Sequence, residues 1–144
     1  QAKLLVSMAD IIENGKGQYM DIVPYNAEMG SYNIDKESLN KLKSKSLMEQ
    51  IDCYKVNATS RFISYSYGEV DSESEVTREK SFWNTDTIEN IIVDDGVIVG
   101  VVAKKFLYGL YHLFPGETIN TYSASEDDGT GSFDRDDYIS IEIK

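Results

Sequence analysis

A nine-residue run near the middle of the chain constrains the fold more than any other feature. Residues 91–99 read Ile-Ile-Val-Asp-Asp-Gly-Val-Ile-Val, so two β-branched runs flank an Asp-Gly pair. Asp-Gly accepts the positive φ angles that a two-residue turn between antiparallel strands requires. The sequence therefore predicts a β-hairpin that turns at Asp95 and Gly96 and pairs residues 91–93 with residues 97–99.

Alternating apolar and polar residues predict several more strands. Residues 61–67 and 106–114 both alternate with a period of two, and Pro115-Gly116 then turns the chain into a strand over 118–123. Residues 138–144 place three isoleucines on one face and polar side chains on the other, as in a half-buried strand. A short apolar segment over 19–25, which contains Pro24, fits an edge strand.

Two segments near the N-terminus show a helical period instead. The first carries its apolar side chains on one stripe, followed by Asn14-Gly15 as a stop: Leu4, Leu5, Met8, Ile11 and Ile12. The second begins with Asp35 as N-cap, runs to about Cys53 and shares one apolar face: Leu39, Leu42, Leu47, Ile51 and Tyr54. Both segments are therefore expected to be amphipathic helices.

These elements together predict an α+β fold, with two N-terminal helices packed on one face of a predominantly antiparallel sheet of about five or six strands. The chain has 144 residues, of which 27% are charged, and no linker or repeat divides it, so we expect one α+β domain over residues 1–144. The single cysteine, Cys53, excludes an internal disulfide and a multi-cysteine zinc site. The longest run of apolar or glycine residues, 97–103, is too short to cross a bilayer.

The charge is distributed unevenly along the chain. Residues 1–68 carry eight cationic and eight acidic side chains, whereas residues 69–144 carry six and seventeen, so the second half holds the whole net charge of −11. The acids gather in two stretches: Glu69, Asp71, Glu73, Glu75 and Glu79, then Glu126, Asp127, Asp128, Asp134, Asp136 and Asp137. Such a surface repels nucleic acid and anionic membranes and attracts cations and basic proteins. Alternatively, the acids only keep the chain in solution.

The second acidic stretch partly fits a calcium-binding loop. With Gly131 as the sixth residue, oxygen side chains fall at ligand positions one, three, five, nine and twelve: Glu126, Asp128, Thr130, Asp134 and Asp137. The first ligand is normally Asp, the twelfth is normally Glu, and strands rather than helices flank the loop. We therefore interpret residues 126–137 as an acidic loop and expect no metal or other cofactor.

No combination of residues predicts catalysis. The only histidine, His112, shares strand parity with apolar neighbours, which is typical of a structural histidine. Neither a Gly-x-Ser-x-Gly motif nor a phosphate-binding loop is present, and the expected position of Cys53 at a helix C-terminus disfavours a thiolate. The sequence therefore points away from an enzyme.

The leading hypothesis is a non-catalytic, acidic protein-binding domain that docks a basic protein partner, as immunity proteins and small inhibitors do. Tyrosines suit recognition surfaces, so the candidate partner-binding residues are Glu69, Asp71, Glu73, Glu75, Asp128, Asp134, Asp136, Asp137, Tyr65 and Tyr67. One alternative is the processed soluble domain of an extracellular pilin-like or surface-assembly subunit, since the chain has no initiator Met. Another is a small-ligand-binding or enzymatic domain with a pocket near His112. The compartment is not determined, although the cytoplasm is slightly favoured.

Overall fold

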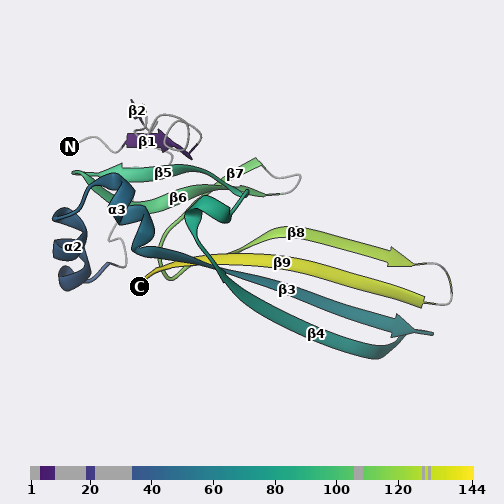
Figure 1. The fold of residues 1–144 in the computed structure, drawn as a ribbon. Coiled ribbons are helices and arrows are strands. Elements are labelled where there is room, and N and C mark those ends of the chain that lie inside the picture. Colours follow the sequence, from purple (N-terminus) through teal and green to yellow (C-terminus); the bar gives the residue numbers. More distant parts are fainter. Residues whose placement is uncertain (1–3, 9–18, 22–33, 106–108, 128, 130) are drawn as a thin grey trace.

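Two antiparallel β-sheets make up most of the computed structural model, which describes residues 4–8, 19–21, 34–105, 109–127, 129 and 131–144 (Figure 1). The five-stranded sheet has the order β2 (Tyr19–Asp21), β1 (Leu4–Ser7), β5 (Ile88–Asp94), β6 (Val97–Lys105), β7 (Gly109–Leu113). The four-stranded sheet has the order β4 (Glu69–Lys80), β3 (Tyr54–Ser66), β9 (Gly131–Ile143), β8 (Thr118–Asp127).

The expected α+β class is wrong, because strands account for 65% of the described residues and the short helices among them form no two-helix layer over a sheet. The first error lies at the N-terminus, where residues 4–7 form strand β1 rather than a helix. β1 lies between β2 and β5, and its Val6 is fully buried opposite Ile91. Pairing with β5 thus outweighs the local helical period. Ile11, Ile12 and Asn14-Gly15 lie outside the described residues.

The predicted second helix is divided in two. Asp35 is the N-cap of α2 (Lys36–Lys43), as predicted, and its carboxylate accepts a 2.7 Å hydrogen bond from the backbone N–H of Ser38. A new helix, α3 (Leu47–Asp52), starts after Ser46, whose side chain and that of Glu49 form a reciprocal capping box. Neither helix is long enough to cover a sheet.

The predicted hairpin is confirmed. β5 and β6 pair antiparallel, with Asp94 opposite Val97 and Val93 opposite Ile98. Asp95 and Gly96 form the turn with φ angles of 52° and 77°. These values match the left-handed geometry that a two-residue hairpin turn requires and that Asp-Gly readily adopts.

Strand β6 is the centre of the hydrophobic core. Its residues from Val97 to Ala103 are all buried, and both sheets and both helices contribute side chains to the same cluster. Gln50 of α3 is buried beside this strand: its amide nitrogen donates to the carbonyl of Gly96 at 2.9 Å, and its oxygen accepts from the N–H of Ile98 at 2.8 Å. The Tyr54 hydroxyl donates to the carbonyl of Ile98 at 2.6 Å. The side chain of Gln50 thus connects α3 to the hairpin by hydrogen bonds.

The remaining strand predictions are confirmed where the structure describes them. Of the predicted 61–67, residues 61–66 lie at the end of β3 and Tyr67 lies in the turn that follows it. Residues 118–123 lie within β8, and 138–143 of the predicted 138–144 lie within β9, where Ile139 and Ile141 are buried. β2 is an edge strand, as expected for 19–25, although residues 22–25 lie outside the described part. β7 covers 109–113 of the predicted 106–114, and residues 106–108 also lie outside it.

The four-stranded sheet extends beyond the rest of the molecule. Tyr54 and Val56 at the start of β3 are fully buried, whereas all twelve residues of its neighbour β4 are exposed. Figure 1 shows β3, β4, β8 and β9 projecting away from the helices and the five-stranded sheet. We call residues 60–66, 69–76, 122–127 and 131–137 of this sheet its distal half.

Candidate functional site

The register of the four-stranded sheet determines which side chains share a face, because directly paired residues of antiparallel strands point to the same side. The inner face carries Val56 and its partner Ile141, which belong to the core. The outer face is the opposite one and carries the alternate residues of β3, including Arg61, Ile63 and Tyr65. In the distal half both faces lie beyond the core.

Four carboxylates meet on the outer face of the distal half. Arg61 lies between Glu75 of β4 and Asp136 of β9, and the next outward residue, Ile63, lies between Glu73 and Asp134. The acids come from the two acidic stretches of the sequence, which β3 brings within one sheet. We call the surface formed by Arg61, Ile63, Tyr65, Glu73, Glu75, Asp134 and Asp136 the acidic face.

Tyr65 belongs to this surface as well. Partial burial together with the nearby Asp134 carboxylate raises the pKa of Tyr65. The phenol therefore keeps its proton at neutral pH and presents a neutral hydrogen-bonding group beside the acids. Five of the ten predicted partner-binding residues are thus brought together: Tyr65, Glu73, Glu75, Asp134 and Asp136.

The other five are placed elsewhere. Tyr67, with a φ of 51°, lies in the turn between β3 and β4. Glu69 begins β4 and pairs with Ser66 on the inner face, and Asp71 lies at the register shift of the two strands. Asp137 is on the inner face, where its carboxylate accepts hydrogen bonds from Ser60 at 2.7 Å and from Arg135 at 3.2 Å. Asp128 lies outside the described residues.

Arg61 is the cation at the centre of the acidic face. Its guanidinium lies 3.0 Å from the carboxylate of Glu73, and this hydrogen bond, with the charges of Glu73 and Glu75, raises the pKa of Arg61. The surrounding acids outnumber it, because the outer face of the whole described sheet carries seven carboxylates and two cations. They are Glu73, Glu75, Glu79, Asp127, Asp134, Asp136 and Glu142, with Lys55 and Arg61.

The inner face has no such excess of acids. Its charged residues are Arg78, Lys80 and Arg135 against Glu69, Glu126 and Asp137. The acidic excess of the sheet therefore lies on its outer face. The sequence contained a pattern that indicates a strand here, because Glu69, Asp71, Glu73 and Glu75 recur with the period of two that is typical of a strand.

The structure replaces the expected acidic loop over 126–137 with a hairpin. Glu126 lies near the end of β8, and Asp134 and Asp137 lie in β9. Asp134 points to the outer face and Asp137 to the inner face, so these two side chains of the calcium frame do not converge. Asp128 and Thr130 are outside the described residues. Within the described ranges, no three His, Cys, Asp or Glu side chains form a group that could hold a metal.

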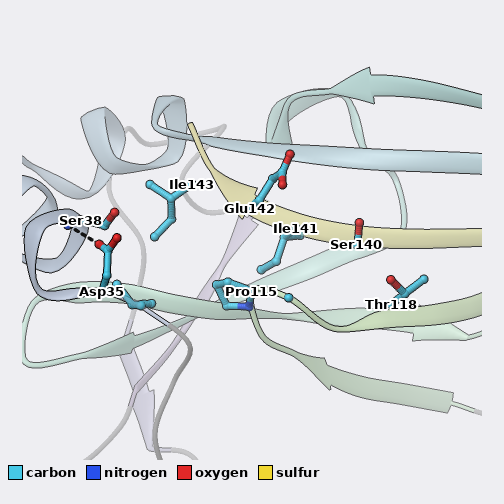
Figure 2. A pocket seen from close by; sticks show the side chains of 10 residues that line it. Asp35, Ser38, Pro115, Thr118, Ser140, Ile141, Glu142 and Ile143 are labelled. Atoms are coloured by element: carbon cyan, nitrogen blue, oxygen red, sulfur yellow. Dashed lines mark hydrogen bonds between the residues drawn. The ribbon is translucent and has the colours of Figure 1, made fainter.

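A cavity of about 420 Å³ near the N-terminus of α2 also contains two carboxylates, Asp35 and Glu142 (Figure 2). Both are already engaged. Asp35 caps α2 at Ser38, and Glu142 lies 2.8 Å from the ammonium of Lys55 and also bonds Asn57. These hydrogen bonds lower the pKa of both carboxyls, so neither suits a general acid at neutral pH.

His112 lies on β7 opposite Val102, in the other sheet from the acidic face. It is half-buried, and desolvation lowers the pKa of His112 below its ordinary value of 6.5. The folded protein therefore holds the imidazole neutral at pH values where the unfolded chain takes up a proton.

Replacing His112 by Gln should leave binding to basic peptides unchanged and change the free energy of unfolding at pH 7 by less than about 1 kcal/mol. Because the folded-state pKa is lowered, wild-type stability should fall as the pH drops below about 6.5, and the variant should lose less stability between pH 7 and 5. Urea unfolding at both pH values measures this. Loss of peptide binding in a variant of normal stability would contradict a structural role.

No helix in the described part of the chain is long and apolar enough to span a membrane. Comparison of the sequence and the structure with protein-family models, curated proteins and solved structures finds no match. The functional argument therefore depends on the geometry of the acidic face.

Proposed function

We propose that this protein is a non-catalytic binding domain whose acidic face docks a basic protein partner, as immunity proteins and small inhibitors do. The observation that supports the proposal is the convergence of Glu73, Glu75, Asp134 and Asp136 on one face of a sheet that projects from the core. Clustered charge of one sign speeds the encounter with a partner of opposite charge and selects against like-charged competitors.

The chemistry of the face suits lysine and arginine side chains. Side chains on one face of a strand recur about 7 Å apart, which is the spacing of Glu73 from Glu75 and of Asp134 from Asp136, so a partner's basic side chain can lie between two carboxylates. Tyr65 and Tyr138, whose partner Thr59 places it on the outer face, add aromatic area with a polar tip. Arg61 neutralises only part of this charge.

The proposal predicts a specific effect of charge removal on association. The variant Glu75→Gln/Asp134→Asn/Asp136→Asn removes three charges from the acidic face and keeps Glu73 paired with Arg61. With fluorescent deca-lysine as the probe, stopped-flow association at low salt should slow about tenfold, while dissociation changes little. Wild-type association should also slow steeply as salt rises.

The matched control is Glu37→Gln/Asp86→Asn/Asp95→Asn, which removes three exposed charges away from the acidic face. It has the same net charge as the test variant and should retain most of the wild-type association rate. Each protein is measured with and without a calcium chelator, because acidic groups also attract calcium. Equal slowing by both variants would mean that only net charge matters and that the acids serve solubility, which would overturn the proposal.

A further inference from the structure

The inner face of the distal half carries an aromatic pair that the core does not use. The rings of Phe62 on β3 and Phe133 on β9 stack with centroids 5.2 Å apart and an interplanar angle of 27°. They line an open groove of about 600 Å³ together with Ser64, Tyr65, Glu126 and Asp127. Phe62 is 37% exposed, although it is one of the largest apolar side chains on this sheet. We call this site the aromatic groove.

The inner-face carboxylate of the groove is Glu126, which is exposed. Asp127 also lines the groove, but its partner Ser132 places it on the outer face, and its carboxylate accepts a 2.8 Å hydrogen bond from the N–H of Gly129. Arg135 lies on the same face, directly opposite Phe62, with its guanidinium 5.6 Å from the centre of the Tyr122 ring and bonded to Asp137. The groove thus combines an aromatic floor with the carboxylate of Glu126, while the neighbouring arginine is bonded to a different acid.

We propose that the aromatic groove receives an arginine side chain of the basic partner. The planar guanidinium stacks on an aromatic ring and donates N–H hydrogen bonds to Glu126, while the methylene stem covers apolar ring surface. Lysine can use the charge but offers neither a planar face nor paired donors, so the groove favours arginine.

This inference rests on the proposed function, because it names a side chain of the same partner. Tyr65 connects the two sites, since it lies near Asp134 on the acidic face and also lines the groove. The groove lies near the end of the sheet, beside the β8–β9 turn that precedes Gly131. A partner bound to the acidic face can therefore reach the groove around the free end of the sheet.

The test compares three labelled peptides of alternating glycine with arginine, lysine or citrulline. Wild-type protein should bind the arginine peptide about two- to fivefold more tightly than the lysine peptide, the factor that 0.5–1 kcal/mol of cation–π energy provides. The variant Phe62→Leu/Phe133→Leu should bind both equally, because it keeps apolar volume and removes the rings. The acidic-face variant Glu75→Gln/Asp134→Asn/Asp136→Asn should bind both peptides more weakly and keep the preference for the arginine peptide.

Two further measurements make the outcome decisive. The ring protons of Phe62 and Phe133 should shift in NMR spectra with the arginine peptide and not with the citrulline peptide. Glu126→Gln, an exposed substitution, should weaken arginine binding more than lysine binding even if the leucine variant folds poorly. The proposed arginine site would be contradicted if wild-type protein bound the arginine and lysine peptides equally tightly. It would also be contradicted if the preference for the arginine peptide survived removal of both phenylalanine rings. An acidic-face variant that binds like wild type would instead overturn the proposed function.

Discussion

Replacing Gln50 by methionine should lower the free energy of unfolding by about 3 kcal/mol, because it leaves the buried N–H of Ile98 and two partly buried carbonyls without their partner. Gln50 is 1% exposed and accepts a hydrogen bond from the N–H of Ile98, which is buried in β6. It also donates to the carbonyls of Lys45 and Gly96. Methionine keeps the length and volume of the side chain, so the loss reports the hydrogen bonds rather than a cavity.

Urea unfolding followed by circular dichroism measures this loss. The matched control is Asn40→Met, the same kind of exchange at an exposed position of α2, which should change stability by less than about 0.5 kcal/mol. Similar stability of wild type and Gln50→Met would show that α3 is not attached to the hairpin through this side chain.

A comparable effect is expected at Gly100, in the middle of β6. A Cβ atom built there would lie 2.6 Å from the ring of Phe114 and 2.7 Å from the carbonyl oxygen of Leu113. β6 is paired with β5 on one side and β7 on the other, so the backbone has no free direction in which to move. Gly100→Ala should therefore cost about 2–3 kcal/mol of stability through overpacking.

The thermal unfolding midpoint measures this cost, and a second background identifies its cause. In a Phe114→Leu protein the ring contact is absent but the carbonyl contact remains, so Gly100→Ala should be less costly there without becoming neutral. A loss below about 0.5 kcal/mol in the wild-type background would contradict the close packing of β6 against the chain at residues 113–114.

The elements that were predictable from sequence are those whose signal is local. The β5–β6 hairpin followed from turn chemistry at Asp95-Gly96, and the N-cap at Asp35 followed from its side chain. The break between α2 and α3 was also visible, because Ser46 and Glu49 have capping-box spacing. Leu4 and Leu5 misled because a short apolar run fits a helix or a strand, and only a neighbouring strand decides between them.

The acidic face was only partly predictable, for a different reason. Its acids were recognisable as candidates, but their grouping depends on the pairing of β3 with β4 and β9, which connects residues as distant as Ile63 and Asp134. No local sequence pattern predicts the pairing of these strands. The same dependence separates Asp137 from Asp136, since one step along a strand moves a side chain to the other face.

The position of strand β4 also affects how molecules of this protein associate with one another. It is the edge of its sheet, twelve residues long and exposed throughout, so its outer backbone groups could pair with a strand of another molecule. Five carboxylates along it repel such a strand while they are ionised. The same acids that suit a basic partner therefore also protect the edge from fibre-like association.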